Sequence, residues 1–573
     1  GKASPNKIRR IRMITTQPKS YFMVVVLIFI LNFVALGQTS VTDQSQLGKV
    51  EFPTSGSKEA QAHFLRGLAA LHSFWYEEAL EAFREATKVE PDFMMGLWGE
   101  AMSHNHPLWS EQDSGAARAV IAKIRETSKL NPREKAYLNA VKVLYGDGDK
   151  RARDEAYSAA MEKIYRAYPD DLDAAAFYSL SLLGLVRSDE KSYRLQARAG
   201  AIALDVYQKN PNHPGAAHYI IHAFDDPEHA ILALPAARRY AGIAPEAHHA
   251  RHMPSHIFLQ LGMWPEAAAS NESAWEASNT WMKRKNLSAS VRDYHSLHWL
   301  LYVYLQQGRY RKAEELLTLM KNTMSEGNYD NKLRPGYYEN NYASMAAAFV
   351  VETERWDRAD NLFGSGAAAV HPASAQSSAS GHGGHGSQPA AGEGAATWRT
   401  SNRGQRLPLF IRALAAAVTG SLKSAPPPSD SNREPSGDAS RVIGELEVAA
   451  LFASVNRQHD KAVELMRLAV QQEERMGPPS GPPGLIKPSH EMFGEILLRA
   501  GKNREAAEQF RIALLRQPNR ARSLLGAARA AAASGNRGEA EAAYARLLDQ
   551  WQLADKELPE LREAQDYLKQ TTP

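Results

Sequence analysis

The stretch that decides the fold runs from Gly67 to Pro91 and reads GLAALHSFWYEEALEAFREATKVEP. It has small residues at Gly67, Ala79 and Ala86, a large one at Phe83 and a proline at its end. Small residues let two helices cross closely, and a large one fills the space between them. Proline ends the unit because it has no amide hydrogen with which to continue a helix. The stretch therefore predicts a pair of packed helices.

The same spacing returns later in the chain. It recurs completely at Gly494, Ala506, Phe510, Ala513 and Pro518. It recurs less completely 34 residues later, at Ala528, Ala540, Tyr544 and Leu547. Further units centre on Ala313, Ala359 and Ala462. The pattern resembles the tetratricopeptide repeat (TPR), a 34-residue helix–turn–helix unit that stacks into a superhelix. The resemblance implies an all-α fold, a TPR-type α-solenoid. Because long alternating apolar stretches are missing, we expect no sheet.

Low-complexity segments interrupt the repeats at residues 364–402, 421–440 and 476–488. The first two are rich in small and polar residues and cannot bury a core, and the third is a stiff Gly-Pro connector. We therefore divide the chain into an N-terminal superhelix, flexible linkers with a short helix at about 403–420, and a C-terminal repeat block. Their bounds are 55–363, 364–440 and 441–570.

Residues 1–37 predict an export signal. They contain six basic residues, no acidic one, and an apolar run from Tyr21 to Leu36 that is shorter than the ~20 residues of a membrane span. Residues 35–37, Ala-Leu-Gly, form a small-x-small pattern that suits cleavage before Gln38. We expect a periplasmic or secreted protein. The alternative is an uncleaved segment that anchors the chain to the inner membrane.

Composition excludes several kinds of chemistry. The 573 residues include no cysteine, which excludes disulfides, thiol catalysis, thiolate zinc sites and iron–sulfur clusters. The formal charge is +4, but beyond residue 37 the chain has 62 basic and 64 acidic residues. This balance gives no electrostatic reason to expect nucleic acid. The partner we expect is a peptide or protein in the concave groove of the repeats, with membrane contact only through the N-terminal segment.

The histidines follow the repeat. Ten of the nineteen lie within residues 213–298. His218 and His222 are four residues apart and so share one face of a helix. His252 and His256 are also four apart, and each follows its counterpart by 34 residues. The resemblance puts all four at places of the first repeat helix that face the groove. The pattern predicts a metal site on these four residues.

Two such pairs on helices roughly 8–10 Å apart can reach one common point and bind a metal at about 2.0–2.1 Å. Imidazole ligands favour a transition metal such as zinc, copper or iron. Further candidate ligands also face the groove, and nearby carboxylates are candidates either to hydrogen-bond the ligands or to bind the metal themselves. The candidate ligands are His249, His295, His298, Glu491 and Glu495, and the carboxylates are Asp225, Asp226, Glu246 and Glu100.

Two local segments carry a narrower resemblance. Residues 478–495 read PPSGPPGLIKPSHEMFGE, and residues 252–258 read HMPSHIF. Together they resemble a group of exported bacterial TPR proteins. That resemblance implies architecture and export, and it implies no catalytic residue.

Three functions stay open at this point. The first is an exported TPR scaffold whose groove carries the metal site, the second a metal-dependent enzyme on the same histidines, and the third an adaptor that binds peptides without metal. The residues between His218 and His222 are apolar, so the glutamate of the zinc-peptidase helix motif is missing. The sequence also lacks a nucleophile elbow, a phosphate-binding loop and a dinucleotide fingerprint. The pattern favours binding over catalysis.

Overall fold

The structure is a computed structural model that describes residues 46–187, 192–325, 336–363, 403–422 and 439–571. All of these belong to one compact unit, Gln44–Pro573. The predicted export signal lies in the other unit, Gly1–Asp43, outside the described residues. Within the described ranges, every helix is too short or too polar to cross a membrane.

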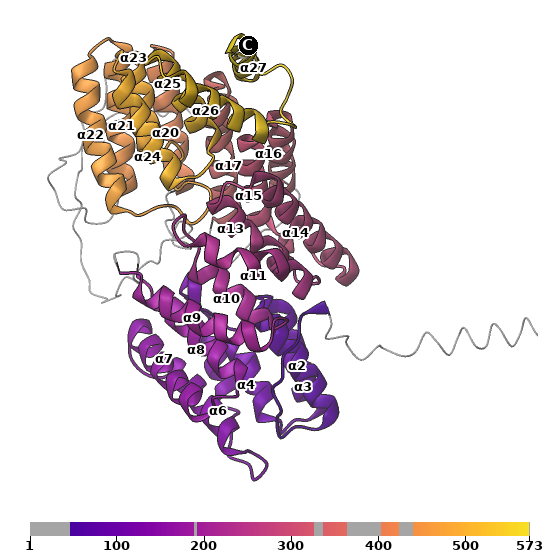
Figure 1. Cartoon of the computed structure of the whole chain (residues 1–573). Coiled ribbons are helices and arrows are strands. Elements are labelled where there is room, and N and C mark those ends of the chain that lie inside the picture. Colours follow the sequence, from indigo (N-terminus) through magenta and orange to yellow (C-terminus); the bar gives the residue numbers. More distant parts are fainter. Residues whose placement is uncertain (1–45, 188–191, 326–335, 364–402, 423–438, 572–573) are drawn as a thin grey trace, which may run out of the picture. The chain divides into compact units, whose positions relative to one another are not determined.

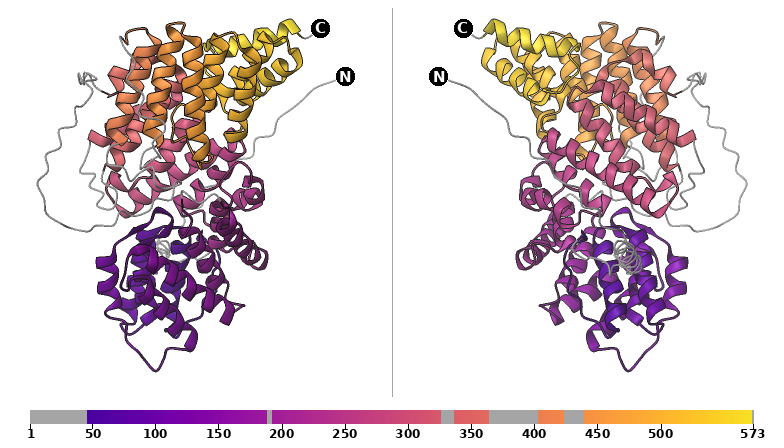
Figure 2. Two further views of the ribbon diagram at one scale, coloured as in Figure 1. Left: turned by 90° about the vertical axis from the view of Figure 1, so that its left-hand side faces the viewer. Right: turned by 90° about the vertical axis from the view of Figure 1, so that its right-hand side faces the viewer.

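The described chain is built from helices that pack chiefly on their neighbours in sequence (Figures 1 and 2). The predicted all-α repeat architecture is confirmed. The helices up to the first histidine pair are α2 (Lys58–His72), α3 (Tyr76–Val89), α4 (Met94–Met102), α5 (Ser114–Ile121), α6 (Pro132–Leu144), α7 (Lys150–Ala167), α8 (Leu172–Gly184), α9 (Arg194–Lys209) and α10 (Pro214–Ala223).

The middle of the chain continues with α11 (Ala230–Ile243), α12 (His248–His252), α13 (Pro254–Gln260), α14 (Trp264–Lys285), α15 (Tyr294–Gln306), α16 (Tyr310–Ser325), α17 (Tyr337–Thr353) and α18 (Ala359–Phe363). After it come α20 (Arg403–Val418), α21 (Ala439–Val455), α22 (His459–Arg475), α23 (Ser489–Arg499), α24 (Asn503–Arg516), α25 (Ala521–Ala533), α26 (Arg537–Gln550) and α27 (Pro559–Thr571). Short 3₁₀ turns are η2 (Pro107–Trp109), η3 (Ala289–Val291) and η4 (Trp356–Arg358).

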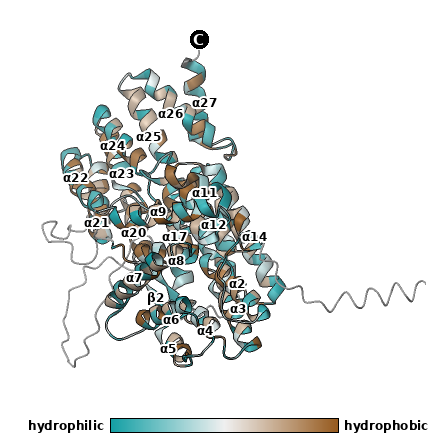
Figure 3. Cartoon of the chain, turned by 60° about the horizontal axis from the view of Figure 1, so that its bottom comes forward, coloured by the Kyte–Doolittle hydropathy of each residue, from teal (hydrophilic) through white to brown (hydrophobic). Residues whose placement is uncertain are grey.

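The small and large residues of the repeat pack as the spacing predicts. Phe83 of α3 is fully buried, and a Cβ on Gly67 of α2 would lie 2.9 Å from its ring. A Cβ on Gly99 of α4 would overlap the same ring. Phe510 of α24 has the same relation to Gly494 and to a glycine of α25. Brown and teal residues alternate along the helices in Figure 3, as expected when each helix buries one face.

One prediction of the sequence is wrong in a small way. We expect no sheet, but β1 (Asn105–His106) pairs antiparallel with β2 (Glu111–Gln112). The turn between them contains Pro107 and Ser110, and Ser110 has a left-handed backbone (φ +48°). Such a tight turn brings two residues on each side into register, which is too short a run to leave an alternating apolar pattern.

The C-terminal repeats pack against the middle of the chain. A hydrophobic cluster contains Tyr302 of α15 together with Leu524 of α25 and Trp551 after α26. The Trp551 indole donates to the carbonyl of Gln306 at 2.9 Å, and the Gln306 side chain accepts from the amide of Ala521 at 2.9 Å. The core is therefore continuous between these parts of the chain.

Candidate metal centre

Six histidines come together from α10, α12, α13 and α15. Helix α10 begins at Pro214 and is capped by His213, whose Nδ1 accepts from the amide of Ala216 at 3.2 Å. Helix α12 ends at His252, and Met253 separates it from α13, whose first residue, Pro254, has no amide hydrogen. Helix α15 is capped by the Asp293 side chain. The histidines they carry are His218 and His222, His249 and His252, His256, and His295.

The first triad consists of His218, His222 and His249. The Nε2 atom of His218 lies 3.1 Å from Nε2 of His222 and 3.2 Å from Nε2 of His249. Nitrogens bound tetrahedrally at 2.0–2.1 Å to one zinc ion are about 3.3 Å apart, so these spacings suit a shared ion. The Nδ1 of His218 is 2.7 Å from the carbonyl of His72 and must donate to it. Its Nε2 therefore keeps a lone pair that points into the triad.

The second triad consists of His252, His256 and His295, whose ligand nitrogens all lie within 4.8 Å of one another. Nε2 of His252 is 3.1 Å from Nε2 of His256. The Nδ1 of His252 donates to Asn271 Oδ1 at 2.7 Å, because the amide nitrogen of Asn271 is used on the carbonyl of Ala267. These bonds leave the Nε2 lone pair of His252 facing the triad.

Asp225, in the loop after α10, orients His256. Its Oδ2 accepts from Nδ1 of His256 at 2.6 Å, and its Oδ1 accepts from the Gln260 amide at 3.1 Å. A carboxylate that accepts from the far nitrogen of a ligand histidine is a usual support of metal sites. The Gln260 amide also donates to the carbonyl of Pro479 at 2.8 Å, so the Gly-Pro connector reaches this site.

All six imidazoles are neutral at physiological pH. Burial lowers the pKa of His252 and of His256 to about 3. Burial, followed by repulsion from neighbouring imidazoles, lowers the pKa of the other four well below the ordinary value. Neutral imidazole is the form that binds metals, so the six rings are ready to act as ligands without losing a proton.

An aromatic ring packs against each triad. The centroid of Phe74 lies 4.3, 5.8 and 5.7 Å from the rings of the first triad, in the order His218, His222 and His249. Trp299 lies 4.2 Å from His256 in the second triad. Phe74 also has a left-handed backbone (φ +54°), which is unfavourable for a bulky residue. Such strain is found at functional sites more often than elsewhere.

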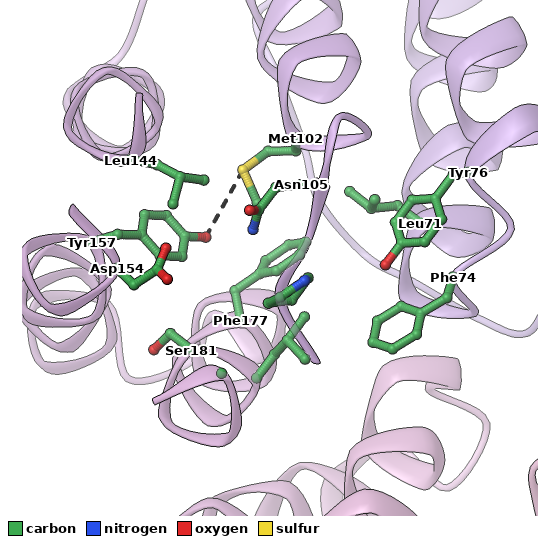
Figure 4. Close-up of a pocket in the computed structure, with 13 residues that line it drawn as sticks. Leu71, Phe74, Tyr76, Met102, Asn105, Leu144, Asp154, Tyr157, Phe177 and Ser181 are labelled. Atoms are coloured by element: carbon green, nitrogen blue, oxygen red, sulfur yellow. Dashed lines mark hydrogen bonds between the residues drawn. The ribbon is translucent and has the colours of Figure 1, made fainter. Parts of the chain in front are cut away.

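An apolar pocket lies against Phe74. It has room for a water-sized molecule over about 30 Å³, and its lining includes Leu71, Phe177 and Leu180. In Figure 4, Phe74 and Tyr76 lie across the pocket from Tyr157 and Asp154. Phe74 therefore contacts the first triad and also lines this pocket.

A third cluster, His72, Asp173 and His213, is fully buried but differs in its protons. His72 Nδ1 lies 2.9 Å from the Tyr219 hydroxyl, and its Nε2 donates to Asp173 at 2.8 Å. Because Nδ1 of His213 accepts from a backbone amide, its proton is on Nε2, 3.4 Å from Asp173. Both rings thus direct N–H groups toward the carboxylate. A metal bound there would need nitrogen lone pairs in those places instead. Burial raises the pKa of Asp173, but these donors outweigh it and hold the pKa well below its usual range.

The predicted ligands are distributed as follows. The two histidine pairs do not meet at one point: each pair converges with a third histidine, His249 or His295, at a point of its own. His298 is buried on α15 outside both triads. Glu491 binds Arg520 (2.7 Å) and Lys487 (3.1 Å), and Glu495 binds Lys487 (2.6 Å), so these carboxylates neutralise buried cations.

The carboxylates predicted to support the ligands also divide. Asp225 does so, whereas Asp226 accepts from His229 at 2.9 Å, and Glu246 and Glu100 pair with arginines. Sequence reasoning missed the supporting groups Asn271, Phe74 and Trp299 and the buried cluster around Asp173. Asn, Phe, Trp and Asp are common in helical repeats, and no spacing relative to the histidines marks these four.

Comparisons with known proteins agree with the repeat. Residues 60–93 match the tetratricopeptide repeat family, and no curated protein matches the chain. The chain is similar to the Cut9–Hcn1 hetero-tetramer of the APC/C (14% identity, TM-score 0.32), covering 89% of this chain and 82% of that one. It is also similar to yeast Tom70 (10%, TM-score 0.22, 89% and 89%) and to the TPR domain of P58(IPK) (12%, TM-score 0.20, 90% and 99%).

At these TM-scores the likenesses add no argument about function. The chain carries a tetratricopeptide repeat at residues 60–93, within an all-helical array. A role as a scaffold or protein-binding module is supported, because such arrays expose extended surfaces to partners.

Proposed function

We propose that this helical-repeat scaffold binds two transition-metal ions, one in each histidine triad. The observation that carries the proposal is the convergence of Nε2 atoms at 3.1–3.2 Å in the first triad and 3.1 Å in the second. The Nε2 lone pair of His218 is within hydrogen-bond distance of both other rings of its triad, and an ion bound there would replace these contacts with coordinate bonds. A peptide-binding groove would instead need imidazole N–H groups that point outward.

The ligand set narrows the choice of metal ion. Each triad offers three neutral nitrogens, and no carboxylate or thiolate belongs to either group. Magnesium and calcium prefer oxygen ligands, and non-haem ferrous sites usually include a carboxylate beside two histidines. Three imidazoles suit zinc or copper and leave a further position for another ligand.

The proposal includes a location outside the cytoplasm, in the periplasm or the medium. The export pattern of residues 1–37 suits a protein that acquires its metal outside the cytoplasm. Fractionation of cells that express the full chain tests this, with recovery in the periplasm or medium expected. Recovery in the cytoplasm would contradict the location and leave the metal sites standing.

Metal analysis of the purified chain tests the sites. We expect two zinc or copper ions per chain, one in His222→Ala or His256→Ala, and none in the double variant. The control is His229→Ala, which removes a histidine bound to Asp226 outside both triads and should leave two ions. If the chain binds neither metal in stoichiometric amount, or if the control loses metal as the triad variants do, the proposal is wrong.

A further inference from the structure

The two triads adjoin each other. His249 of the first and His252 and His256 of the second lie on the consecutive helices α12 and α13. The ring centroids of His222 and His256 are 6.0 Å apart, as are those of His249 and His252. Each pair joins one triad to the other, so two bound ions would lie within one continuous cluster of imidazoles. Metal ions in such paired sites commonly share a ligand across about 3.5–4 Å.

We infer, building on the proposed function, that the two triads form a single dinuclear copper centre that binds dioxygen between its ions. Six neutral imidazoles with no carboxylate ligand suit copper in both of its common oxidation states. With three protein ligands, each ion keeps an open position for an exogenous ligand. One small bridging molecule can fill both positions.

The charge of the cluster favours this ligand. Two Cu(I) ions bring two positive charges, and the six imidazoles of the two triads bring none in their neutral form. Two Cu(II) ions bring four positive charges into a buried site, which is costly unless an anion accompanies them. Dioxygen supplies that anion as it reacts: each Cu(I) gives one electron, the O–O bond order falls from two to one, and a bridging peroxide dianion forms. No proton and no further reductant is needed.

The apolar pocket next to Phe74 provides an approach for such a ligand. Its lining includes Leu71, Phe177 and Leu180, and Phe74 separates it from the first triad. Dioxygen is small and apolar, and cavities with apolar walls stay dry and take up small apolar molecules. Charged ligands would pay a desolvation cost on the same path.

The test loads the full chain with two equivalents of Cu(I) without air and then admits dioxygen. We expect uptake of one dioxygen per two copper ions, a new peroxide-to-copper absorption band, and an oxidised pair that is silent in electron paramagnetic resonance because the two spins couple. His222→Ala and His256→Ala should each keep one copper, lose the band and the uptake, and after chemical oxidation show the signal of one isolated Cu(II). A histidine with only a structural role would not produce a rise in the electron paramagnetic resonance signal when one copper is lost.

Two controls and two outcomes separate the two proposals. The His229→Ala control should behave as the unaltered chain, and circular dichroism should show that both triad variants stay folded. Two bound coppers that give two independent Cu(II) signals and no dioxygen uptake would overturn the dinuclear centre and leave the metal sites standing. A chain that binds no copper and no zinc would overturn both.

Discussion

Replacing Asp225 by asparagine should weaken metal binding at the second triad alone. The Asp225 carboxylate accepts two hydrogen bonds, from His256 on one oxygen and from Gln260 on the other. Asparagine offers one acceptor oxygen, so its amide nitrogen must face one of these two donors. If it faces His256, the imidazole moves its proton to Nε2 and loses the lone pair that the metal needs. If it faces Gln260, His256 keeps a weaker, uncharged partner.

The size of the effect follows from that geometry. Loss of a group that supports a ligand histidine typically costs 10- to 100-fold in metal affinity, or about 1.4–2.7 kcal/mol. The folded chain without metal should lose only about 1 kcal/mol of stability, because one hydrogen bond is exchanged and not a cavity opened. The first triad contains none of these atoms, so its affinity should not change.

The assay is competition between the protein and a zinc chelator of known affinity. It is made in a His222→Ala background, so that the second triad is measured alone. Asp226→Asn is the matched control, since this neighbouring carboxylate also accepts from a histidine, His229, which is not in a triad. The reasoning fails if Asp226→Asn weakens zinc as much as Asp225→Asn, or if Asp225→Asn leaves zinc binding unchanged.

Two further predictions concern stability. Burial raises the pKa of Glu447, whose Oε1 accepts from the Ser489 hydroxyl at 2.8 Å, well above the ordinary value. Its charged form therefore destabilises the fold at pH values above the folded pKa, and this cost disappears as the pH falls toward the pKa of Glu447 in the unfolded chain. Glu447→Gln should raise the thermal midpoint at about pH 8 and have little effect at about pH 5. An equal gain at both pH values would exclude ionisation as the cause. Gly99→Ala should lower the free energy of unfolding by about 1–3 kcal/mol because its Cβ overlaps Phe83, whereas Gly242→Ala, which meets no atom within 4 Å, should raise it by roughly 0.5–1 kcal/mol. Urea unfolding compares the two glycine variants, and changes of the same sign would contradict the packing argument.

The repeat could be predicted from the sequence because it depends on the spacing of residues that are close together in the chain. Phe83 and the glycine and alanines around it recur at fixed intervals, and helix pairing depends on side chains within a few turns of one another. The candidate histidines were found by the same route. His218 and His222, like His252 and His256, lie one helical turn apart, and that spacing already puts the two rings of each pair on one face.

Which histidines meet was decided by the tertiary structure. Periodicity cannot say that His249 joins the pair on α10 while His295 joins the pair on α12 and α13, because those contacts depend on how α10, the bend at Pro254 and α15 pack. For the same reason Glu491, at a groove position by its spacing, could not be assigned in advance to Arg520. Local order along a helix is encoded within a few residues, whereas a metal centre needs atoms from several helices within a few ångströms, and only the packed core sets those distances.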